Sequence, residues 1–237
     1  MKYAAIMYHQ IWAGANAPKF SVDRTEFARQ IAWIKDNNYK TLDLHNVAKI
    51  EQKSVLVTFD DGHASNFAAA QAMTQIGQQG VFYILKNKSL AEQDYLNESQ
   101  LREMSKQGHE LGIHGKDHKW WTKKCDQQFI EEFKETKDWL EQIIGRQVIT
   151  CSAPGGKIDR RIINLIREYS PSIRYIRNSA ETYNESINDT GILNGVAIKY
   201  STSLNQFKKI VTIDRTFYAG HYAMYCVKEL VKRVIGR

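Results

Sequence analysis

Short apolar segments alternate with segments of helical periodicity through the first two thirds of the chain. Segments that are apolar throughout predict strands that are buried on both faces. They lie at residues 4–8, 54–59, 80–85, 110–113, 147–151 and 172–176. Between them, apolar residues recur every three to four positions, which predicts helices at residues 24–37, 64–76, 98–107, 126–144 and 159–169. This alternation favours a parallel sheet that is covered by helices.

The pattern is less regular after about residue 178. Residues 178–194 are polar and are predicted to form a loop, whereas residues 224–237 are predicted to form a basic amphipathic helix. No repeat, low-complexity tract or linker rich in proline and glycine divides the sequence, which contains only three prolines. We therefore expect a single domain over residues 1–237.

The composition is typical of a folded globular protein. Of the 237 residues, 43% are apolar and 25% are charged, which excludes a disordered chain, a collagen and a coiled coil. No window holds the roughly 18 uncharged apolar residues that a membrane span needs. The 33 lysines and arginines exceed the 26 aspartates and glutamates, which gives a net charge of +7. This charge favours anionic partners or peripheral contact with an anionic surface, and no nucleic-acid-binding motif occurs.

The cysteines and the first residues bear on the compartment. Cys125, Cys151 and Cys226 are far apart and odd in number, so we expect no disulfide framework and a reducing compartment. The first apolar run ends at His9 and lacks the apolar core of a signal peptide. A cytoplasmic location is therefore expected, with export left open.

Two adjacent aspartates directly follow the predicted strand at residues 54–59. Successive residues of an extended chain point in opposite directions, so Asp60 and Asp61 can serve different tasks. One carboxylate can bind a metal ion while the other remains free as a base. The alternative is an ordinary polar turn that Gly62 closes.

Two histidines, His114 and His118, follow the predicted strand at residues 110–113. If this stretch forms one helical turn, the two side chains share a face, as in zinc sites with histidines four residues apart. The alternative is a pair of surface histidines beside a turn.

A third segment, residues 152–156, follows the predicted strand at residues 147–151. Pro154 fixes a turn there, and Gly155 allows a ligand to approach the backbone closely. The alternative is a plain connection between a strand and a helix.

The three segments share a position, because each begins where a predicted strand ends. In a parallel barrel the carboxyl ends of the strands converge on one face, where active sites form. An aspartate and two histidines that meet there would make a three-ligand site with open positions, as in catalytic zinc centres. Cobalt, nickel or iron would also suit this ligand set.

The sequence resembles the NodB-type polysaccharide deacetylases, which form carbohydrate esterase family 4. Thr58-Phe59-Asp60-Asp61-Gly62 matches the first motif of that family, and His114-x-x-x-His118 matches the second. Ser152-x-Pro154 stands where the third motif has Arg-x-Pro. The resemblance covers roughly residues 1–160 and implies a distorted (β/α) barrel of about seven parallel strands.

The resemblance also implies roles for the matching residues. Asp60 would be the general base. The three metal ligands would be Asp61, His114 and His118. A backbone N–H near Gly155, which follows the motif proline Pro154, would stabilise the developing oxyanion.

The sequence departs from the family pattern at two points. Ser152 replaces the motif arginine, so Asp60 is expected to lack its usual partner. The late Leu-x-His-Asp motif that supplies the general acid is absent. His221 and His9 are then the candidates for the acid, and His9 could equally be a substrate-side residue.

Trp120 lies between Lys119 and a second tryptophan, directly after the histidine motif. It could stack on a sugar ring beside lysines that favour anionic glycans, or it could be buried in the core. We expect a metal-dependent hydrolase that removes the N-acetyl group from an amino sugar of a surface polysaccharide or its precursor, as in exopolysaccharide biosynthesis. The alternatives are a glycan-binding protein of the same fold with lost or weak catalysis, and a hydrolase of another non-peptide amide bond.

Overall fold

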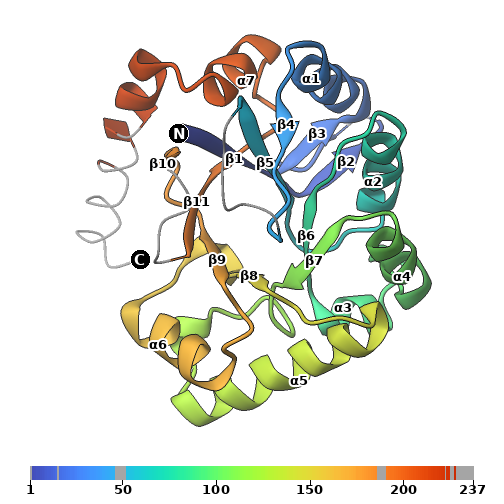
Figure 1. Cartoon of the computed structure of the whole chain (residues 1–237), viewed down its shortest axis with the longest axis vertical. Coiled ribbons are helices and arrows are strands. Elements are labelled where there is room, and N and C mark those ends of the chain that lie inside the picture. The colour runs from blue at the N-terminus through green and yellow to red at the C-terminus, as the bar shows by residue number, and fades with distance from the viewer. Residues whose placement is uncertain are drawn as a thin grey trace.

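Seven parallel strands close into a barrel in the computed structural model, which describes residues 2–14, 16–45, 52–185, 191–221, 223, 224 and 227. Around the ring the order is β1 (Lys2–Tyr8), β5 (Ser54–Phe59), β6 (Val81–Ile84), β7 (Glu110–Ile113), β8 (Thr150–Ser152), β9 (Tyr175–Asn178) and β11 (Ile192–Ala197). Pairing of β11 with β1 closes the ring (Figure 1). The barrel predicted from the sequence is confirmed.

Four short strands of the described residues lie outside this ring. β4 (Lys40–Thr41) pairs in parallel with β5, and β10 (Asn184–Glu185) pairs antiparallel with the start of β1. β2 (Gln10–Trp12) and β3 (Ser21–Asp23) form a separate two-stranded sheet.

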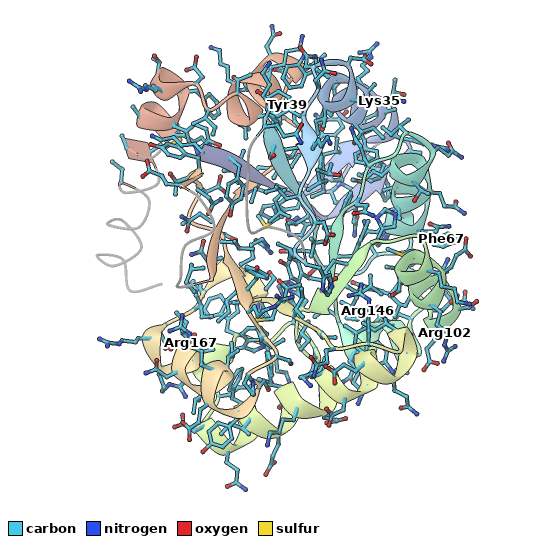
Figure 2. All side chains as sticks on the ribbon, viewed as in Figure 1. Lys35, Tyr39, Phe67, Arg102, Arg146 and Arg167 are labelled. Carbon is cyan, nitrogen blue, oxygen red and sulfur yellow. The ribbon has the colours of Figure 1, made fainter. Side chains whose placement is uncertain are left out.

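Helices surround the barrel, and several connect one ring strand to the next (Figure 1). They include α1 (Arg24–Asp36), α2 (Ser65–Gln75), α3 (Lys86–Ala91), α4 (Glu98–Lys106), α5 (Asp126–Ile144), α6 (Arg160–Tyr169) and α7 (Leu204–Val211), and residues 215–221 are also helical. Short 3₁₀ turns occur at Trp121–Lys123 and Pro154–Gly156. The charged side chains of Lys35 and Arg102 lie on the outer side of their helices, exposed to solvent (Figure 2).

Capping residues lie at the ends of several of these helices. The side chain of Asp23 accepts hydrogen bonds from the first backbone N–H groups of α1, and Asp159 does the same at α6. Gly145 ends α5 with a φ of 70°, a left-handed conformation that glycine adopts without a steric cost.

The core has two parts because alternate residues of each strand face opposite sides of the sheet. In β1, Tyr3 and Ala5 belong to a cluster inside the barrel. Ala4, Ile6 and Tyr8 belong to the larger cluster between the barrel and the helices. Buried polar side chains, among them Asp60, His114 and Arg177, lie instead at or just beyond the ends of their strands.

The structure differs from the sequence prediction mainly in the last third. Residues 178–194 are not one loop, because β10 lies within them and β11 begins there. Asn194 and Gly195 interrupt the apolar pattern of β11, which hid the strand. The predicted strands at residues 147–151 and 172–176 are displaced toward the C-terminus as β8 and β9. Most of the helix predicted at residues 224–237 lies outside the described residues.

No helix of the described part of the chain combines the length and the apolar character that crossing a membrane requires.

Candidate metal centre and active site

Asp61, His114 and His118 converge at the end of the barrel where the strands finish. Asp61 follows β5, and both histidines follow β7. The Oδ1 atom of Asp61 lies 3.3 Å from Nε2 of His114 and 3.4 Å from Nε2 of His118. One ligand atom from each residue can be chosen so that all three lie within 4.8 Å of one another. The structure therefore brings together the three residues that the sequence selects as candidate ligands.

The two histidines meet through a loop and not through the helical turn that their spacing suggested. Residues 114–120 have no helical structure, and Gly115 has a φ of 95°. His118 itself adopts a left-handed φ of 61°. These two left-handed residues turn the chain back, so that the rings lie 5.2 Å apart between their centroids. A helical turn was the wrong geometry, although the convergence was expected.

His114 is oriented by the neighbouring strand. Its ring is buried, and its Nδ1 atom lies 2.9 Å from the carbonyl oxygen of Ser152 on β8. A carbonyl only accepts, so Nδ1–H is the donor, and whenever the ring is neutral its lone pair is on Nε2. Nε2 and the carboxylate oxygen of Asp61 are then two acceptors that face each other. A cation between them would satisfy both, and such a carbonyl contact behind a histidine is usual in metal sites.

The carboxylates of the cluster attract positive charge. Burial opposes ionisation of Asp61, but the imidazoles of His114, His9 and His118 hold the pKa of its carboxyl well below the ordinary range. Burial also opposes a charge on His114, yet the carboxylates of Asp60 and Asp61 raise the pKa of its ring. Two nitrogens and one carboxylate oxygen, with no thiolate, are the donor set of a catalytic zinc site. The residues present therefore fit a divalent metal ion.

Asp60 lies beside this cluster, and only one of its two carboxylate oxygens has a partner among the described residues. Its side chain is buried, and Oδ2 is 3.9 Å from Nε2 of His114. Oδ2 also forms an ion pair with the guanidinium of Arg177. Oδ1 is buried and has no hydrogen-bond partner among the described residues. One carboxylate oxygen is thus held in place, while the other can accept a proton.

Arg177, on β9, is the site residue that the sequence analysis missed. Its Nη2 atom donates hydrogen bonds to the Asp60 carboxylate and to the hydroxyl of Ser152. The expectation that Asp60 lacks an arginine partner was therefore wrong: the arginine comes from the strand next to position 152. The residue stands just beyond the predicted strand at 172–176, and only the inward alternation from Tyr175 could have indicated it.

The two candidate acids lie in different surroundings. His9 follows β1, and its Nδ1 atom is buried without a hydrogen-bond partner among the described residues. Burial lowers the pKa of this ring, while the nearby charges of Asp60 and Asp61 act in the opposite direction. The contacts described for His221 are instead with Glu181, whose carbonyl oxygen lies 3.5 Å from Nδ1, and with the ring of Phe217.

Pro154, Gly155 and Trp120 border the same end of the barrel. A Cβ atom at Gly115, next to His114, would lie 3.5 Å from Pro154, which places the proline turn against the histidine loop. Trp120 is 40% exposed, whereas the adjacent Trp121 is buried in the core. The ammonium group of Lys157 lies 4.0 Å from the centroid of the Trp120 ring. Of the two tryptophans, Trp120 is the one that a ligand can reach.

The sequence model of the polysaccharide deacetylase family matches residues 48–171, which contain the two aspartates, both histidines and the proline turn. The chain belongs to this family.

A curated relative supports the same family assignment. YxkH of Bacillus subtilis (strain 168), whose name places it among the polysaccharide deacetylases, is 28% identical over 170 residues. The match covers 68% of this chain but only 60% of YxkH, so the chain spans less than two thirds of that relative.

Solved structures share the fold over most of the chain. The deacetylase PplD of Streptococcus pyogenes, in complex with acetate, superposes with a TM-score of 0.80 at 20% identity, covering 89% of this chain and 98% of PplD. A de-N-acetylase of Aggregatibacter actinomycetemcomitans gives a TM-score of 0.78 at 14% identity, covering 89% of this chain and 100% of its own. These likenesses show the NodB-like barrel.

Proposed function

We propose that this family member is a metal-dependent amidohydrolase that removes the N-acetyl group from an amino sugar of a surface polysaccharide or its precursor, releasing acetate. The observation that carries the proposal is the convergence of Asp61, His114 and His118 on one point, with the Asp60 carboxylate beside them. Family membership supports the reaction class. The names of PplD and of the Aggregatibacter enzyme describe deacetylation by proteins of the same fold.

Asp61, His114 and His118 would hold the metal ion, for which we propose zinc, with cobalt, nickel or iron compatible with the same donors. When bound there, a divalent ion supplies Lewis acidity toward the acetyl carbonyl and a lowered pKa for a nearby water. The side chains of Asp61 and His118 are partly exposed to solvent, so a substrate can approach them.

Asp60 is the general base of the proposed reaction. Its free Oδ1 atom takes a proton from the attacking water, and the water oxygen bonds to the acetyl carbon. A backbone N–H near Gly155 stabilises the negative charge that develops on the carbonyl oxygen. The C–N bond then breaks, and the nitrogen leaves with a proton as the free amine of the sugar.

His9 is the residue that we propose as the donor of that proton. It follows β1, which pairs with β5, the strand that the two aspartates follow. A ring with an unpartnered buried nitrogen has a hydrogen-bonding position left for substrate. The sequence offered His221 for this task, but the contacts described for His221 join it to Glu181 and Phe217. We therefore prefer His9 as the acid.

Trp120 is the proposed sugar-binding surface. Aromatic faces stack on the apolar faces of sugar rings, and this indole is the exposed one at the barrel mouth. Lys157 above the ring adds a positive charge, which favours a glycan with anionic groups near the acetamido sugar.

Acetate release tests the proposal. Purified protein loaded with zinc is incubated with β-1,4- and β-1,6-linked N-acetylglucosamine oligomers, and acetate is measured by an enzyme-coupled assay. We expect release by the wild type and a loss of roughly 100-fold or more in Asp60→Asn, which keeps the shape but not the basicity. Asp138→Asn, at an exposed aspartate of α5, is the matched control and should remain active.

The outcomes distinguish the alternatives. A wild type that binds zinc and these oligomers without releasing acetate would overturn the proposal in favour of a glycan-binding protein. Release of another product from a different amide would reassign the substrate. Loss of metal as the main effect of Asp60→Asn would make Asp60 a ligand and not the base.

A further inference from the structure

We infer that Arg177 is the positioning residue for Asp60, and that it replaces from β9 an arginine that position 152 on β8 would otherwise supply. The inference rests on the proposed function, because it takes Asp60 as the base. It adds that the arginine that holds Asp60 can stand at either of two neighbouring positions, 152 or 177.

Arg177 extends inside the barrel and not toward the helices. Along β9, Tyr175 belongs to the interior cluster and Ile176 to the outer one, so Arg177 points inward again. Its side chain is fully buried. Burial of a guanidinium costs free energy unless partners match its charge. Nε of Arg177 has no partner among the described residues, but both Nη atoms do.

Those partners come from several strands around the ring. Nη2 donates to the carboxylate of Asp60, after β5, and to the hydroxyl of Ser152 on β8. Nη1 contacts the sulfur of Met7 on β1, and the guanidinium carbon lies 5.2 Å from the centroid of the Tyr83 ring on β6. The group therefore crosses the barrel interior and ends at the base.

The order of the strands explains why β9 can do this. From β5 the ring runs through β6 and β7 to β8 in one direction, and through β1 and β11 to β9 in the other. β8 and β9 are thus each three strands away, and they share the side of the barrel opposite Asp60. A long side chain from either strand crosses the same interior to reach the carboxylate.

Positions 152 and 177 are also direct neighbours. Ser152 and Arg177 are register partners in the parallel β8–β9 pair, so their side chains leave the sheet on the same face about 5 Å apart. The hydroxyl of Ser152 contacts the very nitrogen that binds Asp60. Ser152 is small where Arg177 is large, and the two occupy one interior space. An arginine at either position fills that space, whereas two arginines cannot.

The planar guanidinium suits this task better than an ammonium group. It can bind Asp60 and Ser152 through one nitrogen while its other nitrogen contacts Met7 and the carbonyl oxygen of Asn178. This fixes Oδ2 of Asp60 and leaves Oδ1 directed away from the ion pair. A lysine at 177 would keep the charge but lose the fixed direction.

Moving the arginine back to β8 tests the inference. Four proteins are compared: the wild type, Arg177→Ser, Ser152→Arg, and the double variant Arg177→Ser/Ser152→Arg. Each is measured for zinc content, for the midpoint of thermal unfolding, and for kcat and KM of acetate release from the N-acetylglucosamine oligomer that the wild type turns over best.

We expect Arg177→Ser to retain zinc and KM but to lose roughly 100-fold in kcat, because the base is no longer held in direction. It should also lower the thermal midpoint by roughly 10 °C, since it leaves a buried carboxylate unpaired. Ser152→Arg alone should be destabilised as well, because two cations share one space. The double variant should recover kcat to within about tenfold of the wild type and should melt above both single variants.

Arg177→Lys separates charge from direction, and it should recover part of the thermal midpoint but less of kcat than the double variant does. The inference is overturned if Arg177→Ser keeps wild-type kcat, or if the double variant folds, binds zinc and stays as slow as Arg177→Ser. A wild type that releases no acetate would refute the proposed function instead. In that case the thermal midpoints alone test the exchange of the arginine between the two positions. If the two substitutions lower the midpoint additively, the inference is overturned. If the double variant melts above both single variants, the inference is supported.

Discussion

Gly155 lies directly against the indole of Trp120. A Cβ atom at position 155 would come within 2.8 Å of Nε1 of Trp120, closer than any side chain can sit. The glycine also has a φ of 66°, a left-handed conformation that other residues adopt only at a cost. The glycine at 155 thus permits both the turn after Pro154 and the position of the exposed tryptophan.

Gly155→Ala should therefore raise the KM for N-acetylglucosamine oligomers by about tenfold, because it displaces the stacking surface. Bound zinc should not change. Gly77→Ala is the matched control: it has a similar φ of 72°, and a Cβ atom there meets nothing within 4 Å. Both variants should lose about 1 kcal/mol of stability from the backbone alone. An unchanged KM in Gly155→Ala would show that Trp120 does not contact the substrate.

His9→Gln should lower kcat by about 100-fold or more while zinc binding is retained, because the leaving amine loses its proton donor. The effect should be in kcat and not in KM, which steady-state kinetics on the same oligomers will separate. His221→Gln serves as the control and should have nearly wild-type kcat. The reverse result, with His221 essential and His9 dispensable, would restore the candidate that the sequence placed first.

His109 lies at the opposite end of the barrel from the metal centre, and it makes the stability of the protein depend on pH. The ring is buried between the end of α4 and β7, and its Nδ1 atom accepts a hydrogen bond from the N–H of Gly80 at 3.1 Å. Nε2 lies 3.1 Å from the carbonyl oxygen of Ala70, to which it donates. Burial lowers the pKa of His109 from 6.5 to about 4, against the opposing effect of the Ala70 carbonyl.

The folded protein therefore binds this proton less readily than the unfolded chain does. The contribution of His109 is fully present above pH 6.5 and is lost as the pH falls toward 4, by up to about 3 kcal/mol. His109→Gln can keep both hydrogen bonds but does not titrate. Denaturant unfolding between pH 7 and pH 4 should show a shallower decline of the unfolding free energy in His109→Gln than in the wild type. Parallel declines would contradict the assignment.

Much of the candidate site could be predicted because it depends on local sequence. Asp61, His114 and Pro154 each stand just after an apolar strand, and the topology of a parallel barrel brings such positions together. Predicting that these residues meet therefore required no detailed geometry. The direction of the His118 ring could not be predicted in this way, because it depends on left-handed residues within the loop.

Arg177 could not be predicted in the same way. It meets Asp60 across 117 positions of sequence, and only after the ring has closed through β11. That closing strand contains Asn194 and Gly195, so its apolar pattern is interrupted and the segment resembles a loop. A motif comparison at position 152 records only the missing arginine, whereas the register between β8 and β9 shows where the arginine is.

The metal content of the purified protein tests the central claim most directly. The wild type, His114→Ala and His221→Gln are stripped with a chelator, reloaded with zinc, dialysed and measured by elemental analysis. Three converging ligands predict about one zinc ion per chain in the wild type and in His221→Gln, and loss of that ion in His114→Ala. A wild type without a stoichiometric ion, or a fully loaded His114→Ala, would contradict the account.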